Sequence, residues 1–486
     1  MHIDLPRDAA SVCYVTTGAG TLEGRQTGEA IRFLAIPYAR PPIGKARFRP
    51  PESLEHWVGV RSADSFASVA PQLPDPGFYP GDPDAMPPCP MSEDCLYLNV
   101  WTPVSPGPHP VLVWLHGGSQ LIGGTSRPVY NGSMFARAGI TCVTVGYRLG
   151  MFGFLELGKQ LGTAYVDSGN CALRDQLAAL EWVRDNIASF NGDLTQITLG
   201  GESAGGKNVA ALMAAPAAQG LFHAAIIISG GADTVSSQAE AEAVAERIVS
   251  VGGVSASQLL DASTEQILTW QATLLRSGIR KLPFRPAYGG DFLPQSPLST
   301  IKGGWGASVP LLIGTSHDES LPTVQAMIAE EPWQQDQLSH LDPEMLTAIE
   351  MRLRSVQPEL TWRESRLRVL SAEEYGLPSL RLADAHASSG NPTWMYRHDR
   401  GLMAGPFAGF APHVSDLNWV WGHLLDVPKL RGVDDLHVTV CSFVKERSAS
   451  WDQYSIPRRR TAIFKNSRCV VDDPSRNTRG LFEDIN

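Results

Sequence analysis

A serine framed by glycines is the feature of this sequence that most directly suggests chemistry. Residues 201–205 read Gly-Glu-Ser-Ala-Gly, directly after the apolar run Ile197–Leu199 and before small residues that begin at Val209. A strand, then Gly-x-Ser-x-Gly, then a helix predicts a sharp turn that exposes the hydroxyl of Ser203, because glycines admit a close chain crossing. The pentapeptide alone also occurs in ordinary Ser-Gly turns. Its flanking strand and helix favour a nucleophilic serine.

A second glycine pair could supply what a serine nucleophile needs besides a base. Acyl transfer requires a base beside the serine, an acid that orients the base, and donors for the oxyanion. His116-Gly117-Gly118 follows the apolar run that ends at Leu115, and adjacent glycines let backbone N–H groups approach a substrate oxygen. An ordinary Gly-Gly turn is the alternative. The position after a buried strand and upstream of Ser203 favours an oxyanion hole.

Several short apolar runs predict the sheet that would position these residues. They have the continuous apolar character of strands buried on both faces, and they are Val111–Leu115, Thr141–Val145, Ile197–Leu199, Ala225–Ile228 and Pro310–Gly314. Between two of them a helical pattern has Leu173, Leu177, Leu180 and Ile187 on one side and Arg174, Asp175, Glu181 and Asp185 on the other. Strands that alternate with helices predict an α/β fold with a mainly parallel sheet. In such sheets the chemistry gathers at the carboxyl ends of the strands.

The remaining segments predict coverings of the sheet rather than further domains. Residues 232–275 and 323–389 are predicted to be helices over the active face of the sheet. Residues 71–90 contain eight prolines and two glycines, which predicts an ordered surface loop or lid. No internal repeat or low-complexity tract is present in the sequence. We therefore predict one domain over residues 1–486.

Composition and charge exclude several classes of protein. The 486 residues are 43% hydrophobic and carry a net charge of −10, which supports a large core and gives no general attraction to nucleic acid or anionic membrane. The longest apolar stretch, residues 210–228, is interrupted by polar residues and Pro216, so no membrane span is expected. The seven cysteines lack metal-ligand spacing, and the first residues do not resemble a secretion leader. We expect a soluble, cytoplasmic protein.

The motifs together resemble the type-B carboxylesterase family, which includes bacterial p-nitrobenzyl esterases and animal cholinesterases. Residues 93–100 (Glu-Asp-Cys-Leu-Tyr-Leu-Asn-Val) match the second signature of the family, and residues 201–206 match its serine signature. Further matches lie at residues 36–39, 41–42, 147–150, 175–176, 222–226 and 471–474. The resemblance runs from about the tenth residue almost to the C-terminus. It implies an α/β-hydrolase fold with the triad order serine, acid, histidine.

The resemblance also implies the acid and the oxyanion donors. The acid of the family is the Glu of an Asp-Glu-Gly motif after a Leu-Ile-Gly-Thr strand, and the register of that motif falls on Glu319, with Asp318 as the rival. The oxyanion donors implied by the family are the N–H groups of Gly118, Ser119 and Ala204. Ser119 stands where the family usually has a third glycine.

For the base, the resemblance implies His413. The histidine of the family opens a His-x-x-Glu-Leu-x-x-Val-Phe pattern, and the counterpart here begins at His413, with Asp416 in place of the Glu. The nearby alternatives are His398 and His423. His398 follows an apolar run that resembles a strand, and we expect it to be a structural histidine.

These patterns predict an enzyme that hydrolyses a small-molecule carboxylic ester through an acyl-serine intermediate. A non-catalytic adhesion or scaffold protein is the alternative from another class, and the intact Ser203, Glu319 and His413 argue against it. Carbamate or amide cleavage and acyl transfer stay open, because the same groups serve these reactions. No metal or other cofactor and no nucleic-acid or membrane partner are expected. The expected state is a monomer or a small homo-oligomer.

Overall fold

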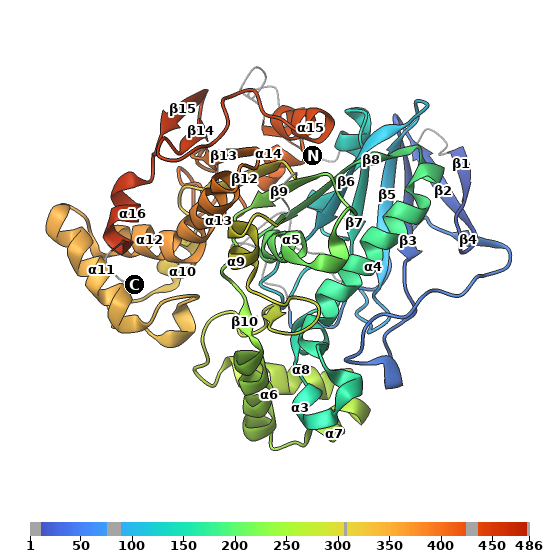
Figure 1. The fold of residues 1–486 in the computed structure, drawn as a ribbon, viewed down its shortest axis with the longest axis horizontal. Coiled ribbons are helices and arrows are strands. Elements are labelled where there is room, and N and C mark those ends of the chain that lie inside the picture. Colours follow the sequence, from blue (N-terminus) through green and yellow to red (C-terminus); the bar gives the residue numbers. More distant parts are fainter. Residues whose placement is uncertain (1–10, 75–88, 306–308, 424–435, 484–486) are drawn as a thin grey trace.

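A large mixed sheet forms the centre of the molecule (Figure 1). The computed structural model describes residues 11–74, 89–305, 309–423 and 436–483. The strands of the 13-stranded sheet, in their order across it, are β1 (Ser11–Thr16), β2 (Thr21–Thr27), β3 (Ala30–Pro37), β5 (Tyr97–Pro103), β7 (Thr141–Val145), β6 (His109–Leu115), β8 (Gly192–Glu202), β9 (Ala224–Ile228), β12 (Leu311–Ser316), β13 (Thr393–His398), β14 (Arg460–Phe464) and β15 (Arg468–Asp472), and β4 (Val60–Ser62) pairs with β2. A separate two-stranded sheet joins β10 (Ser236–Ser237) to β11 (Ala287–Tyr288).

The middle of the sheet is parallel and its two ends are antiparallel. From β7 to β14 each strand pairs in parallel with the next strand across the sheet. The strands from β1 to β7 at one end, and β14 with β15 at the other, pair antiparallel. All five strands predicted from apolar runs are confirmed as β6, β7, β8, β9 and β12. The antiparallel ends were not predicted, because strands such as β1 and β15 are largely exposed and lack a continuous apolar run.

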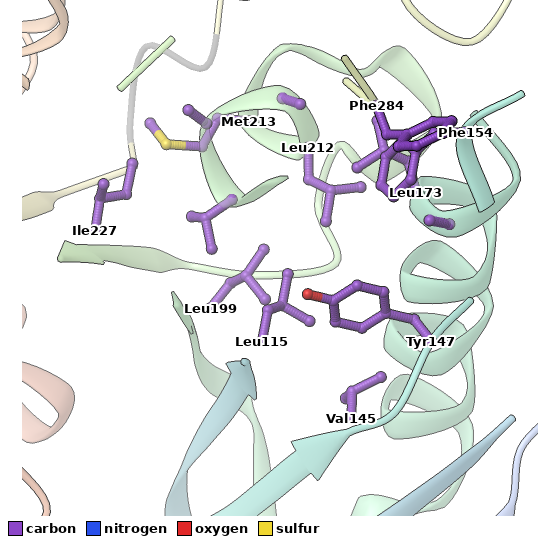
Figure 2. Packing of buried hydrophobic residues seen from close by; sticks show 14 of the residues in the cluster. Leu115, Val145, Tyr147, Phe154, Leu173, Leu199, Leu212, Met213, Ile227 and Phe284 are labelled. Atoms are coloured by element: carbon purple, nitrogen blue, oxygen red, sulfur yellow. The ribbon is translucent and has the colours of Figure 1, made fainter. Parts of the chain in front are cut away.

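Two hydrophobic clusters pack against opposite faces of this sheet. Along β6, Val111, Val113 and Leu115 belong to one cluster, whereas Leu112 and Trp114 belong to the other. This alternation follows from the two-residue period of a strand. Helices α4 (Cys171–Asn186) and α5 (Ala204–Ala214) contribute to the first cluster, and α1 (Ser133–Arg137), α14 (Leu417–Val420) and α15 (Leu436–Glu446) to the second. Figure 2 shows the first cluster between the strands, α4 and α5.

Helix α4 buries its predicted apolar side but also one residue predicted to be exposed. Leu173 and Leu180 are fully buried, as their helical spacing predicts. The prediction that Asp175 lies on the polar, outward side is wrong, because its carboxylate is fully buried. Both of its oxygens accept hydrogen bonds from the guanidinium of Arg148, at 2.6 and 2.8 Å. A bidentate ion pair of this kind satisfies a charge that would otherwise be unpaired in the core.

Helices form in both segments in which they were predicted, residues 232–275 and 323–389. They are α6 (Gln238–Gly252), α7 (Ala256–Asp261), α8 (Thr264–Leu275), α10 (Leu321–Ala326), α11 (Pro343–Val356), α12 (Trp362–Ser371), a π-helix over Ala372–Gly376 and α13 (Leu377–Ser388). Capping boxes begin α6, α7, α8 and α12, where a serine or threonine is followed three residues later by Glu or Gln. In Figure 1, α6, α7 and α8 gather below the sheet, and α10, α11 and α12 lie at its left.

Four further short α-helices lie in the described part of the chain. They are α2 (Gly150–Phe154), α3 (Gly158–Leu161), α9 (Pro297–Lys302) and α16 (Arg476–Phe482). Most of the predicted loop at residues 71–90 falls outside the described residues, which exclude 75–88. Within the described part of the chain, no helix has the length and apolar character needed to cross a membrane.

Candidate active site

Ser203 occupies the sharp turn between β8 and α5. Its φ of +54° and ψ of −119° lie outside the regions that side chains ordinarily favour. The turn is possible because Gly205 passes close to β6: a Cβ on Gly205 would lie 2.0 Å from the backbone oxygen of Leu115. The N–H of Ser203 donates to the oxygen of Ile228 at 2.8 Å, which ties the turn to the end of β9. The sequence therefore builds a strained, well-anchored serine at the carboxyl end of β8.

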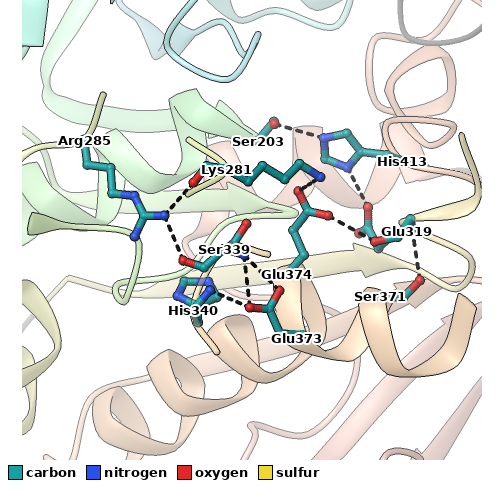
Figure 3. A network of polar contacts seen from close by, with 11 residues as sticks. Ser203, Lys281, Arg285, Glu319, Ser339, His340, Ser371, Glu373, Glu374 and His413 are labelled. Carbon is teal, nitrogen blue, oxygen red and sulfur yellow. Dashed lines mark hydrogen bonds and ion pairs between the residues drawn. The ribbon is translucent and has the colours of Figure 1, made fainter. Parts of the chain in front are cut away.

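Two side chains from later strands join Ser203 in a continuous chain of hydrogen bonds (Figure 3). The Nε2 of His413 lies 2.9 Å from the Oγ of Ser203, and its Nδ1 lies 2.6 Å from the Oε2 of Glu319. In the tautomer that fits this geometry, Nδ1–H donates to the carboxylate and Nε2 accepts from the serine hydroxyl. The serine follows β8, the acid follows β12, and the histidine follows β13. The three sequence-predicted residues are thus brought together.

Glu319, and not Asp318, contacts the imidazole of His413. The Oε1 of Glu319 accepts from the hydroxyl of Ser229 at 2.6 Å and from the N–H of Ser316 at 2.7 Å. Asp318 points to the neighbouring loop, where its carboxylate accepts from the N–H of Ala411 at 2.9 Å. Its Oδ1 lies 2.8 Å from the Nδ1 of His317. Glu319 is therefore placed to orient His413, and Asp318 to hold the loop that carries it.

Charge removal at these two neighbours should separate their roles. We expect Glu319→Gln to lower kcat by roughly 10³-fold or more, because the imidazolium formed in the transition state loses its stabilising charge. Asp318→Asn keeps an oxygen for the N–H of Ala411 and should lower kcat by less than about tenfold. Steady-state kinetics on an aryl ester, with melting temperatures to monitor folding, measure both. Equal losses, or the reverse ranking, would remove the orienting role from Glu319.

The carboxylates around His413 stabilise the protonated form of its imidazole. Burial opposes the charge, but the nearby carboxylates of Glu319, Glu202 and Glu374 outweigh it and raise the pKa of His413 above its usual 6.5. The ring of Tyr375 packs against the imidazole at a centroid distance of 4.3 Å. Protonation of His413 during a reaction is therefore stabilised by the surrounding residues.

Glu202, the residue before the serine, is a buried carboxylate beside the site. It accepts hydrogen bonds from the N–H of Gly117 and the hydroxyl of Tyr130. Its Oε2 is buried without a hydrogen-bond partner among the described residues. Burial, the largest influence, raises the pKa of Glu202 above its usual range. Sequence reasoning treated Glu202 only as part of the serine motif, although its place in that motif was the available signal.

The predicted oxyanion donors lie in two turns, one after β6 and one at the start of α5, and their N–H groups are not used in the described structure. Gly118 and Ser119 have φ values of +116° and +58°, and a Cβ on Gly118 would lie 2.0 Å from the oxygen of Ile122. Ala204 is the first residue of α5, whose positive end faces the turn. Within the described residues, no hydrogen bond uses the N–H groups of Gly118, Ser119 or Ala204. Three donors are thus left for a negatively charged oxygen.

Ser119 keeps the turn despite replacing a glycine, because the next residue anchors it. Gln120 also adopts a left-handed conformation, with φ of +63°. Its side-chain amide donates to the Oδ1 of Asn208 at 2.5 Å, and its backbone oxygen accepts from the N–H of Gly150 at 2.6 Å. These bonds join the turn to α5 and α2, so the strain of two left-handed residues is offset by local contacts.

The alternative histidines lie away from the serine. His398 ends β13 and is buried, and burial lowers its pKa to about 3. The Nε2 of His423 lies 2.8 Å from the oxygen of Val129. Over the described ranges, no group of three His, Cys, Asp or Glu residues is arranged to hold a metal ion.

Comparisons with known proteins point to one family. The profile of the carboxylesterase family matches residues 11–435. The para-nitrobenzyl esterase of Bacillus subtilis (strain 168) is 34% identical over 492 residues, which cover 96% of this chain and 97% of that protein. The liver carboxylesterase of Sus scrofa is 32% identical, over 77% of this chain and 72% of that protein. The crystal structure of carboxylesterase EST55 from Geobacillus stearothermophilus aligns with a TM-score of 0.81 and 31% identity, over 97% of this chain and 100% of that one.

Proposed function

The chain belongs to the carboxylesterase family, and we propose that Ser203, His413 and Glu319 are the residues with which it hydrolyses carboxylic esters. Hydrolysis of these esters by a serine hydrolase mechanism is the activity of the family. One observation carries the residue assignment: the hydrogen bonds from Ser203 to His413 and from His413 to Glu319, at 2.9 and 2.6 Å. A serine at neutral pH becomes nucleophilic when a base of this kind accepts its proton.

In the proposed acylation step, the Oγ of Ser203 attacks the ester carbonyl while the Nε2 of His413 accepts the hydroxyl proton. Glu319 stabilises the imidazolium that forms. The carbonyl oxygen becomes an oxyanion and receives hydrogen bonds from the N–H groups of Gly118, Ser119 and Ala204. Collapse of the tetrahedral intermediate breaks the C–O bond to the alcohol, which leaves with the proton from His413. The product of this step is an acyl-serine.

In the proposed deacylation step, the same groups act on water. His413 accepts a proton from a water molecule as its oxygen attacks the acyl carbon, and the oxyanion donors again hold the developing charge. Collapse releases the carboxylic acid and returns the proton to the Oγ of Ser203. The alternative of a non-catalytic scaffold does not account for the hydrogen-bonded chain of Ser203, His413 and Glu319.

Matched acyl derivatives should separate ester hydrolysis from amide and carbamate chemistry. We expect kcat/KM for 4-nitrophenyl acetate to exceed that for 4-nitroacetanilide by at least ~10²-fold, because only the ester offers an easily expelled oxygen. A 4-nitrophenyl carbamate should give a burst of nitrophenol and then slow turnover, as the carbamoyl-serine accumulates. Stopped-flow and steady-state absorbance measure both. Faster turnover of the anilide would make the enzyme an amidase.

We also propose that residues 1–486 form a single domain. The support is that the strands nearest the two ends of the described chain, β1 and β15, belong to the same sheet. A cytoplasmic location and a monomeric or small homo-oligomeric state stay predictions from the sequence.

A further inference from the structure

A buried lysine lies one helical turn after the proposed nucleophile. Lys207, on α5, is 6% exposed, and its backbone N–H donates to the oxygen of Ser203 at 3.0 Å. Residues four apart on a helix share a face, with their Cα atoms about 6 Å apart. The ammonium of Lys207 lies 5.3 Å from the ring centroid of Tyr375, the same ring that packs on His413. The cation therefore lies close to the triad.

Among the residues that the structure describes, Lys207 makes no ion pair or side-chain hydrogen bond. Glu374, the carboxylate with the largest electrostatic effect on Lys207, is already engaged at both oxygens. Its Oε1 pairs with the ammonium of Lys281 at 2.6 Å, and its Oε2 accepts from the hydroxyl of Ser320 at 3.2 Å (Figure 3). Buried charges in proteins are ordinarily paired, so an unpaired ammonium next to a reactive serine is exceptional.

The second carboxylate of this region is also engaged. Glu373 is buried, and its Oε1 accepts from the backbone N–H groups of Ser339, His340 and Leu341 at 3.1, 2.5 and 3.0 Å. Figure 3 shows these bonds beside Glu374. Among the described residues, neither glutamate forms an ion pair with Lys207.

A further cation in the same region, the guanidinium of Arg285, also has no carboxylate partner among the described residues. The guanidinium of Arg285 donates to the backbone oxygens of Leu282, Lys281 and Ser339 at 2.6, 2.8 and 2.8 Å. In the described part of the chain, Lys281 is paired with Glu374, whereas neither Lys207 nor Arg285 forms an ion pair with a carboxylate. A substrate carboxylate would supply the partner that the buried ammonium of Lys207 lacks.

A rare backbone conformation presents part of this region to the triad. Glu373, Glu374 and Tyr375 belong to the π-helix at Ala372–Gly376, between α12 and α13. Short π-helical segments are uncommon and occur frequently at functional sites, because they re-aim side chains that an α-helix would turn away. Here the segment directs one ring against His413 and one carboxylate to Ser320, beside the proposed acid.

We propose that Lys207 is the binding partner of a carboxylate carried by the substrate, and that the enzyme therefore prefers anionic esters to neutral esters of the same shape. The carboxylate would belong to the acyl group, as in a monoester of a dicarboxylic acid, or to the alcohol, as in an ester of a hydroxy acid. The inference rests on the proposed function, because it takes Ser203 as the reacting residue. It makes Lys207 a specificity-determining residue of that same site.

Two pairs of substrates test the preference and identify the side that carries the charge. Monophenyl adipate and its terminal primary amide differ in charge on the acyl side, and 4-acetoxybenzoate and 4-acetoxybenzamide differ on the alcohol side. We expect the anionic member of one pair to have a kcat/KM roughly 10- to 100-fold higher than its amide at pH 7. Equal values within both pairs, with the neutral esters still hydrolysed, would overturn the inference and leave the proposed function standing.

The wild-type preference should also depend on pH. Burial lowers the pKa of Lys207 to about 8, against the opposing effects of Glu374 and Glu373 and with the added repulsion of Arg285 and Lys281. Lys207 is therefore charged below that pH and neutral above it, whereas the substrate carboxylate stays ionised throughout. The ratio of kcat/KM within the selective pair should fall as the pH rises through about 8. The ratio cancels the titration of His413, which affects both substrates alike.

Charge removal at Lys207 gives the decisive comparison. Lys207→Met keeps the length of the side chain and should abolish the preference, so the ratio of kcat/KM within the selective pair of esters should fall to about one. Lys159→Met is the matched control, because Lys159 is an exposed lysine paired with Glu246, and it should keep the full preference. A Lys207→Met enzyme that retains the preference would overturn the inference.

Binding of the free anion separates failure of the inference from failure of the proposed function. Calorimetric titration with adipate and with 4-hydroxybenzoate needs no turnover. We expect one of them to bind wild-type enzyme at least ~10-fold more tightly than Lys207→Met. If the enzyme hydrolyses no ester, the proposed function fails and this titration still decides whether Lys207 binds a carboxylate. Equal binding to both enzymes would overturn the inference.

Discussion

Replacement of Ser203 by alanine is expected to lower kcat for a simple aryl ester by at least ~10³-fold while the protein still folds. The change removes the Oγ that would attack the carbonyl and its hydrogen bond to His413 at 2.9 Å. Alanine has the same Cβ as serine, so the strained φ of +54° gains no new contact. Steady-state kinetics give kcat, and the melting temperature shows whether the fold is kept.

Covalent labelling gives an independent check of Ser203. An aryl phosphonate should add one group to the wild-type chain and none to Ser203→Ala, and peptide mass analysis should place it at residue 203. Ser257→Ala, which alters an exposed serine on α7, is the control and should be labelled like the wild type. An adduct on any other peptide, or full activity in Ser203→Ala, would show that another residue is the nucleophile.

The strands that could be predicted from the sequence are those buried on both faces of the sheet. Strands such as β6 and β9 lie between helices on both faces, so residues 111–115 and 224–228 are all apolar and each run is visible in the sequence. The strands at the ends of the sheet lack that constraint: in β15 four of five residues are exposed. Asp175 failed as a prediction for the opposite reason, because its partner Arg148 lies 27 positions away and no periodic pattern reports an ion pair.

The candidate site divides in the same way. Ser203, Glu319 and His413 could be predicted because each lies in a local motif with a fixed register. Ser229 and Tyr375, which contact the acid and the base, have no such motif, and their roles depend on segments that meet only in the folded chain. The sequence shows Lys207 four residues after the serine, but only the folded structure shows that it has no carboxylate partner among the described residues. The oxyanion turn was predictable only in part. Its glycines form a local motif, whereas the hydrogen bond that anchors Gln120 to Asn208 forms only in the folded chain.

His413→Ala is expected to lower kcat/KM by roughly 10³-fold or more at every pH, because no other described imidazole lies within hydrogen-bond reach of Ser203. His398→Ala is the comparison among the histidines. Its ring is buried at the end of β13, so the change should lower the melting temperature, with a loss of about 1–3 kcal/mol in stability, and leave kcat nearly unchanged below that temperature. Full activity in His413→Ala, or loss of turnover in a folded His398→Ala, would exchange the two roles.

The pH profile of the wild-type enzyme also tests the role of His413 as the base, because that role fixes the direction in which activity changes with pH. His413 must be neutral to accept the serine proton, so kcat/KM for a neutral ester should rise as the imidazole loses its proton. Glu319, Glu202 and Glu374 outweigh burial and raise the pKa of His413 above 6.5, so the midpoint should lie above that value. Asp416, whose pKa burial and Glu319 raise to about 7, titrates beside it, so the observed midpoint belongs to the pair. Stopped assays from pH 5 to 9 measure the profile. A midpoint well below 6.5, or activity that falls as the pH rises through this range, would contradict the role of His413 as the base.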